Sequence, residues 1–241
     1  MEELCFFDCN AMVGKRRIKN PGSFYETEEL IRKMEYYRIG KALVCHAAAC
    51  EYEAMTGNYM LADEIKQYPN LCGMWVLLPH HTGEFPNASD TKTLLKENNI
   101  PAVTMLPRTN GHSTEEWICG DLYEMLEEHR VPLIISSEQL SYENVHEILS
   151  NHPQLRLILT NLHYSCGRNL YPLLNKFEHL YIETIGFKVH GGIEDICNKF
   201  GAKRLIFGSC APVYSGGAAV GMISYAQISN QEKRLIASEN L

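Results

Sequence analysis

Short apolar runs alternate with amphipathic segments along the whole chain of 241 residues. Runs such as LILTN and LIFGS are nearly continuous in β-branched or apolar residues, which is typical of strands that are buried on both faces. The eight predicted strands cover residues 4–10, 41–46, 72–79, 100–107, 132–136, 156–161, 180–185 and 204–210. A strand–helix unit repeated eight times predicts an α/β fold, a single (β/α)8 TIM barrel with its helices outside a parallel eight-stranded barrel.

The segments between the runs carry the signals of helix ends. Thr27 is the predicted N-cap of the first helix and Gly40 its predicted stop. Ser141 is predicted to cap a later helix that ends before Pro153. The other predicted helices cover residues 59–68, 89–99, 120–130, 171–177, 192–200 and 229–241. No linker, low-complexity tract or repeat interrupts the pattern, so we expect one domain over residues 1–241.

Composition excludes several classes of partner. The formal net charge of −7 and the pI near 5.8 argue against a surface for nucleic acid or anionic membranes. No apolar run reaches the roughly 18 residues of a membrane span, and the acidic start does not read as a secretory signal. The nine cysteines form no CxxC pair, and an odd number within apolar runs indicates reduced thiols. We therefore expect a cytoplasmic protein without a nucleic-acid or membrane partner.

The chemistry of such a barrel is expected at one face. Every strand delivers its last residues to the C-terminal mouth, where barrels of this kind hold their active sites. The predicted strand ends carry Asn10, Met12, Ser136, Asn161 and Cys210. We expect a ligand at this mouth to be held by these five residues together with Arg108 and His46.

The loops after the third and fourth strands are the longest polar stretches. The second of them, RTNGHSTEEW, contains Arg108, His112 and Trp117. An aromatic ring beside Arg and His side chains could hold a small anionic ligand, with Arg108 as a bidentate anchor for a carboxylate. The alternative is a solvated loop whose tryptophan packs on the following helix.

The opening residues FFDCNAMVG resemble the first strand of the amidohydrolase-related family, a branch of the amidohydrolase superfamily. The usual pattern there is Asp-x-His-x-His-x-Gly, and it stands here as Asp8, Asn10, Met12 and Gly14 with other residues between them. The closing segment RLIFGSCAPV is similar to the family's last strand, and the resemblance spans essentially the whole chain. It implies a TIM barrel of the metal-dependent hydrolase or non-oxidative decarboxylase type, which would use zinc or another divalent ion.

The departures from that family fall on its metal ligands. The resemblance implies two His on strand one, a His ending strand five, a His ending strand six and an Asp ending strand eight. The matching residues are Asn10, Met12, Ser136, Asn161 and Cys210. Amides, a hydroxyl and a thioether are poor zinc ligands, and one thiolate does not make a site. We therefore predict no metal and no other cofactor.

A relocated metal is the alternative to its loss. Four histidines end or follow predicted strands, and together with Cys210 they offer enough donors: His46, His80, His81 and His163. No two of them have the helical or alternating spacing that would direct them at one ion.

Three residues are the candidates for catalysis: Cys210, Glu183 and His46. Cys210 could act as a nucleophile or fill the space of the missing ligands, and a nearby carboxylate would raise its pKa. Glu183 could be a general base or a hydrogen-bond partner of Ser136 or Asn161.

Two classes of function follow. The first is a hydrolase or carboxy-lyase that acts on a small carboxylated substrate, and the second is an inactive pseudoenzyme that binds a small molecule or a partner subunit. A small-molecule ligand is the expected partner, and a homo-oligomer stays open.

Overall fold

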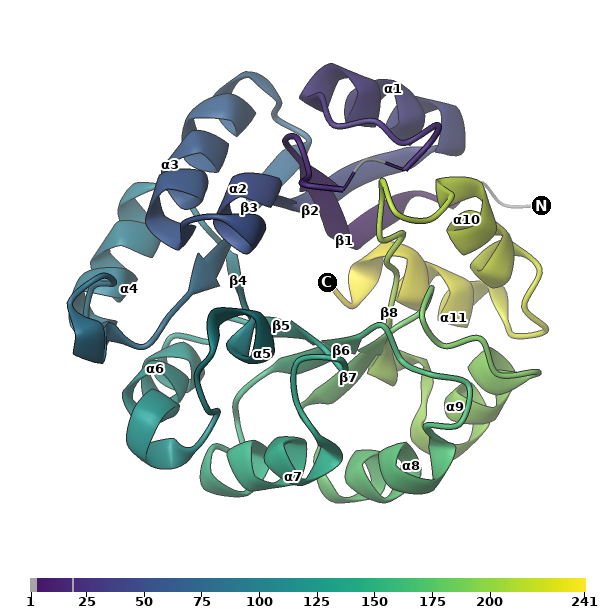
Figure 1. Ribbon diagram of the computed structural model, residues 1–241. Coiled ribbons are helices and arrows are strands. Elements are labelled where there is room, and N and C mark those ends of the chain that lie inside the picture. The colour runs from purple at the N-terminus through teal and green to yellow at the C-terminus, as the bar shows by residue number, and fades with distance from the viewer. Residues whose placement is uncertain (1–3, 19) are drawn as a thin grey trace.

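The computed structural model describes residues 4–18 and 20–241. Eight parallel strands follow one another in chain order, and each pairs with the next (Figure 1). They are β1 (Phe6–Val13), β2 (Ile39–His46), β3 (Leu71–Leu77), β4 (Ala102–Met105), β5 (Leu133–Ser136), β6 (Leu157–Thr160), β7 (Leu180–Glu183) and β8 (Leu205–Ile206). The ring closes where the Cys9 N–H donates to Phe207 O (2.9 Å) and the Met12 N–H donates to Ala211 O (2.8 Å). The predicted (β/α)8 TIM barrel is confirmed.

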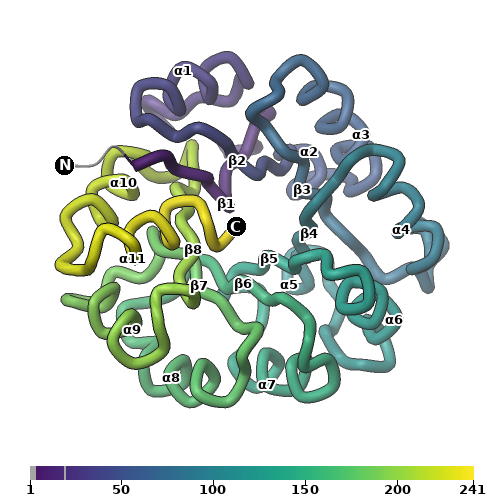
Figure 2. The backbone as a smooth tube through the Cα atoms, turned by 180° about the vertical axis from the view of Figure 1, so that it is seen from behind, coloured from purple at the N-terminus to yellow at the C-terminus, as the bar shows by residue number. Residues whose placement is uncertain are grey.

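Helices surround the strands on all sides in both views of the backbone (Figures 1 and 2). They are α1 (Thr27–Tyr37), α2 (Ala47–Glu51), α3 (Ala54–Glu64), α4 (Ala88–Glu97), α5 (Pro107–Asn110), α6 (Glu116–Glu128), α7 (Tyr142–Asn151), α8 (Gly167–Lys176), α9 (Gly192–Phe200), α10 (Gly216–Ser224) and α11 (Asn230–Arg234). A π-helical turn (Leu235–Glu239) follows α11. Within the described residues, no helix is long and apolar enough to cross a membrane.

The ends of the helices agree with the prediction in one case and differ in another. Ser141 caps α7 as predicted, and its hydroxyl accepts from the Asn144 N–H (3.2 Å) in a capping box. At α1 the N-cap is Glu26, and the helix ends before Arg38, which adopts the left-handed conformation (φ 61°). Gly40 is therefore not the stop of α1 but a residue of β2. A Cβ atom at Gly40 would lie 2.8 Å from Cys5 Sγ, so close approach explains this glycine.

Three helices were not predicted. They are α2, α5 and α10. The first two are only one turn long and directly follow β2 and β4, and α10 carries three glycines, which weaken the helical signal. In Figure 1, α2 and α5 lie over the strands near the centre of the barrel.

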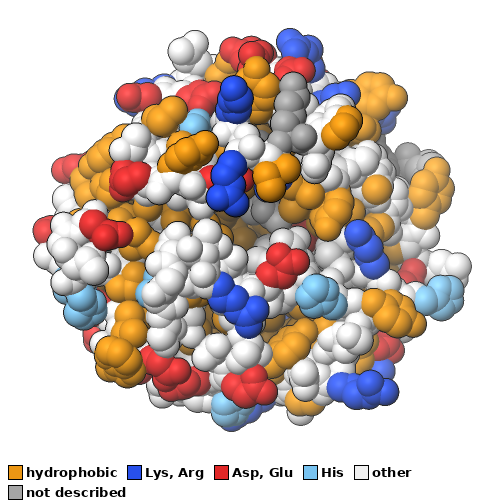
Figure 3. All heavy atoms as spheres, viewed as in Figure 1, with side chains coloured by type: hydrophobic (Ala, Val, Ile, Leu, Met, Phe, Trp, Pro, Cys, Tyr) orange, Lys and Arg blue, Asp and Glu red, His pale blue; other side chains and the backbone are white. Residues whose placement is uncertain are grey.

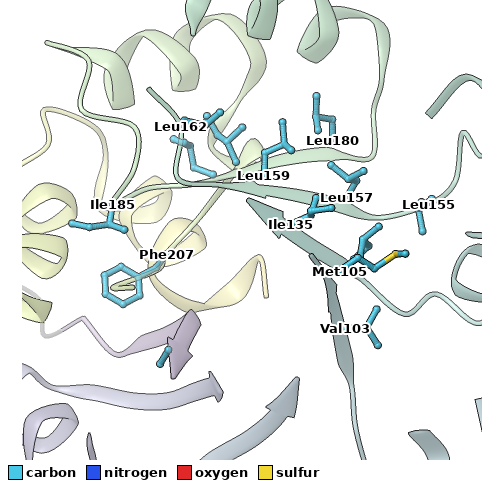
Figure 4. Close-up of a cluster of buried hydrophobic side chains, with 14 of the residues drawn as sticks. Val103, Met105, Ile135, Leu155, Leu157, Leu159, Leu162, Leu180, Ile185 and Phe207 are labelled. Carbon is cyan, nitrogen blue, oxygen red and sulfur yellow. The ribbon is translucent and has the colours of Figure 1, made fainter. Parts of the chain in front are cut away.

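Alternate residues of each strand face opposite sides of the barrel wall. One set forms a cluster in the interior: Cys9, Leu43, Cys45, Met74, Ala102, Ile134, Ile158 and Ile206. The other set packs against the helices. Figure 4 shows part of this outer layer, in which Ile135, Leu157, Leu159 and Phe207 are buried. The interior cluster fills the barrel below the ends of the strands, so a ligand inside the barrel could be held only at the mouth.

Candidate functional site

Glu183 is the last residue of β7, and its side chain lies on the inward face of the barrel wall. Tyr181, two residues earlier on the same face, packs against the interior cluster. The Glu183 side chain is fully buried. Gly208 makes room for it, because a Cβ atom there would lie 2.5 Å from Glu183 Cγ. The sequence thus places a carboxyl group inside the barrel directly beneath its mouth.

One oxygen of this carboxyl group is satisfied and the other is not. Glu183 Oε1 accepts from the Ile185 N–H (2.6 Å), whereas Oε2 has no hydrogen-bond partner among the described residues. Burial, with a smaller contribution from the charge of Asp8, raises the pKa of Glu183 to about 8. The group can therefore hold a proton at neutral pH and release it slightly above.

Three predicted site residues form a row across the ends of β5, β6 and β8. Cys210 Sγ donates to Asn161 Oδ1 (3.9 Å), and Asn161 Nδ2 donates to Ser136 Oγ (3.3 Å). Asn161 and Cys210 both have a φ of 53°, a left-handed conformation that is uncommon for residues other than glycine. Asparagine tolerates it, but a cysteine there is strained. The structure thus brings together Ser136, Asn161, Cys210 and Glu183, four of the eight predicted residues.

The environment of Cys210 keeps its thiol protonated. Burial, and after it the charge of Glu183, raises the pKa of Cys210 to about 12. A thiol attacks as its thiolate, so Cys210 is a poor nucleophile near neutral pH. Its contact with Asn161 instead makes it part of the wall of the site.

Asp8 is a site residue that the sequence analysis did not select. It is buried on β1, and its Oδ1 accepts from the Ser209 N–H (2.8 Å) and the Asn10 N–H (3.0 Å). Its second oxygen accepts from the Ser209 hydroxyl. These bonds fix Ser209 and therefore the strained residue after it, Cys210. The sequence feature that could have identified Asp8 is its position two residues before Asn10 on the same strand.

The positions of the family's metal ligands do not fit a metal ion. Within residues 4–18 and 20–241, no three His, Cys, Asp or Glu side chains gather in a way that could hold one. Asn161 and Ser136 bond to one another, and Cys210 bonds to Asn161 rather than pointing at a shared centre. The two family positions on β1 hold Asn10 and Met12, and Met12 packs against the interior cluster.

His46 lies away from this row. Its neighbour Cys45 belongs to the interior cluster, so alternation along β2 turns His46 toward the helices. Its Nδ1 accepts from the Ala48 N–H (3.1 Å), and its Nε2 lies 3.7 Å from Glu64 Oε2. Burial lowers the pKa of His46, although Glu64 opposes the shift. The histidine caps α2 and borders a separate hollow with Gly14, and it does not converge on Cys210.

The polar loop after β4 divides into two parts. Arg108 lies on α5 and is exposed, and its backbone N–H donates to Gln139 Oε1 (3.1 Å). Trp117 and His112 instead line a groove of about 380 Å³, and the Trp117 side chain is 78% exposed. Arg108 does not line this groove, so the structure does not place the arginine beside the two rings.

A cation near the row was also missed. Arg16, in the loop after β1, has a charge that lowers the pKa of Cys210 slightly against the larger effects of burial and Glu183. Its Nε donates to Glu51 Oε1 of α2 (3.2 Å). Figure 3 shows this face of the molecule, with a hollow near its centre and both basic and acidic side chains at the rim.

No protein-family model and no curated protein sequence matches the chain. Solved structures do. An uncharacterised TIM-barrel protein from Bordetella bronchiseptica has a TM-score of 0.79 at 14% identity, and the match covers 98% of this chain and 96% of that one. A 5-carboxyvanillate decarboxylase from Novosphingobium aromaticivorans with bound manganese has a TM-score of 0.77 at 14% identity, and coverage is 98% and 95%.

A third similar structure is a candidate amidohydrolase from Staphylococcus aureus, with a TM-score of 0.76 at 13% identity and coverage of 98% of both chains. Identities this low establish the fold alone. The three structures agree with the TIM barrel that the resemblance of the first and last strands implied.

Proposed function

We propose that this barrel is an enzyme of the hydrolase or lyase kind that acts on a small carboxylated substrate at the C-terminal mouth. The observation that carries the proposal is Glu183, a buried carboxyl group with an unpartnered oxygen and a pKa near 8. Efficient general acids and bases have pKa values near the working pH, and strongly shifted groups cluster at functional sites. The fold is also one that decarboxylases of carboxylated aromatic compounds use.

In a decarboxylation, the bond between the substrate carbon and its carboxyl group breaks, and the electron pair stays on that carbon. A proton must then reach the carbon, and neutral Glu183 can donate it through Oε2. In a hydrolysis, ionised Glu183 can accept a proton from the attacking water. Either step uses the oxygen that the protein leaves free.

The row of Ser136, Asn161 and Cys210 has the polar groups to position such a substrate. The Asn161 amide and the Ser136 hydroxyl can exchange their mutual hydrogen bond for bonds to a carboxylate or a phenolic oxygen. Arg16 adds a positive charge near the row, which the ion pair with Glu51 partly offsets. The five positions of the family's metal ligands do not fit a metal, and the proposed reaction uses none.

A panel of hydroxybenzoates, small lactones and activated esters tests the proposal, with product formation followed by chromatography and mass spectrometry. We expect turnover of at least one compound, with a pH profile that changes near pH 8. Glu183→Gln should lower the rate by about 10²–10⁴-fold, the usual contribution of a general acid or base. Glu143→Gln, on the exposed surface of α7, is the matched control and should keep the rate.

Glu183→Gln with undiminished turnover would exclude Glu183 as the proton-transferring group. Turnover of no compound would favour the second function, a pseudoenzyme that binds small carboxylates. One observation supports that alternative: the Cys210 thiol is held protonated and is not poised for attack. Calorimetric titration with the same carboxylates then tests the pseudoenzyme, which should bind a carboxylate that it does not convert.

A further inference from the structure

A pair of thiols lies beside the mouth, and the proposed function does not use it. Cys50 Sγ of α2 lies 3.8 Å from Cys45 Sγ of β2. Cys45 is buried in the interior cluster, and Cys50 is half-buried at its upper edge. Among the described residues, no other cysteine forms a hydrogen bond with a second thiol.

The start of α2 explains why the two thiols meet. His46 is the N-cap, so Cys45 occupies the position before the cap and Cys50 the fourth position of the helix. These two positions contact one another in the hydrophobic staple, a common arrangement at helix starts that fixes the angle at which the chain enters. Cysteines replace the usual apolar pair here. The contact therefore belongs to the local geometry of the helix start.

We propose that Cys45 and Cys50 form a reversible disulfide when the protein meets a hydroperoxide. The inference is independent of the proposed enzymatic function. The sulfur atoms need only approach from contact to bonding distance, a movement that a short helix at the rim of the barrel can supply. Cys50 is the more exposed of the two and is the thiol that the oxidant reaches first.

The reaction balances with the hydroperoxide as the only co-reactant. Cys50 sulfur attacks the peroxide, so that an S–O bond forms, the O–O bond breaks and an alcohol or water leaves with the thiol proton. Cys45 sulfur then attacks the Cys50 sulfenic acid, the S–S bond forms, and the hydroxyl group leaves with the Cys45 proton as water. Two thiols are oxidised, and one hydroperoxide is reduced.

The disulfide would lock α2 against β2. Glu51, the last residue of α2, accepts from Arg16 Nε (3.2 Å) and from the Arg17 N–H. Arg16 contributes its side chain and Arg17 its backbone, and both residues belong to the loop after β1. Oxidation would thus stiffen one side of the rim.

Peptide mapping of the full chain tests the proposal. The reduced protein is exposed to hydrogen peroxide and is then denatured in the presence of N-ethylmaleimide, which labels the remaining free thiols. Digestion with trypsin leaves both cysteines in the peptide 42–66. We expect this peptide to lose two hydrogen atoms and to carry no maleimide label, and to accept two labels after reduction. Cys72→Ser, in a different peptide, should leave this result unchanged, and Cys50→Ser should abolish the loss of two hydrogens.

Three results would overturn the proposal. The first is a peptide 42–66 that keeps two reactive thiols at peroxide concentrations that oxidise the exposed Cys5. The second is a Cys50 sulfinic acid beside a free Cys45. The third is a bond between Cys45 and Cys210, which would make Cys210 and not Cys50 the partner.

Discussion

The wall of the barrel is regular on one side and irregular at its seam. Strands β5 and β6 pair over four consecutive residues without a register shift, from Leu133 opposite Leu157 to Ser136 opposite Thr160. Strand β1 has two register shifts, and β8 is only two residues long. The buried carboxyl groups of Asp8 and Glu183 lie at the irregular seam. Regular pairing thus goes together with apolar packing, and irregular pairing goes together with buried carboxyl groups.

The largest effect on stability is expected on the regular side. Leu159 of β6 is completely buried between the barrel and its helices (Figure 4). Leu159→Ala removes apolar contacts and leaves a cavity, so the free energy of unfolding should fall by about 2–5 kcal/mol in urea titrations. Cys9→Ala, on the interior side of β1, removes a smaller side chain and is the control. A loss below about 1 kcal/mol at Leu159 would show that this side can collapse around the cavity.

Asp8→Ala should produce the next largest loss. The substitution leaves the Ser209 N–H, the Ser209 hydroxyl and the Asn10 N–H without their acceptor. Buried groups left without a partner cost about 1–3 kcal/mol, and burial already raises the pKa of Asp8, which offsets part of its contribution. Asp8→Asn keeps one acceptor oxygen and should lose less. Equal losses for both variants, measured by thermal and urea unfolding, would contradict this role of the oxygen atoms.

Glu183→Gln should change how stability depends on pH. Because the pKa of Glu183 is raised from 4.5 to about 8, the folded state keeps its proton over a range in which the unfolded state has lost it. The contribution of this group to stability is therefore full below pH 4.5 and is lost as the pH rises toward 8. Glu183→Gln removes the dependence, and at pH 8 the variant should be more stable than the wild type. A variant with the wild-type slope would show that Glu183 ionises normally.

The sequence was sufficient to predict the fold and the polar row of the site. Eight apolar runs define the barrel, and the common direction of parallel strands brings Ser136, Asn161 and Cys210 together at their ends. Glu183 was identifiable as the one carboxyl group at a strand end with an inward position. These predictions depend only on alternation along strands and on barrel geometry, which local sequence encodes.

The remaining features depend on contacts that local sequence does not encode. The register shifts of β1 decide where Asp8 points, and they are visible only when β2 and β8 are in place. His46 was expected at the mouth, yet the position of Cys45 in the interior turns it outward. The contact of Cys45 with Cys50 requires α2, a helix of five residues that no periodic pattern reveals.

The smallest effect is expected at His46, on the outer side of the seam. Its Nδ1 accepts a hydrogen bond as the cap of α2, and burial lowers its pKa, so protonation is harder in the folded state. This contribution to stability is present above the ordinary pKa of 6.5 and is lost as the pH falls through the lower folded value.

The His46→Asn substitution separates the cap from the titration. Asparagine caps helices well but does not titrate, so the variant should keep stability at neutral pH and should lose less than the wild type on acidification, by at most about 1 kcal/mol. Glu183 makes stability depend on pH with the opposite sign over the same range. Because this contribution is the same in both proteins, it cancels in the difference between the melting temperatures of variant and wild type. If the difference stays constant with pH, then Glu64, 3.7 Å from Nε2, cancels the effect of burial on His46. The stability of the outer side would then not depend on pH through His46, and the pH response of the seam would come from its two buried carboxyl groups, Asp8 and Glu183.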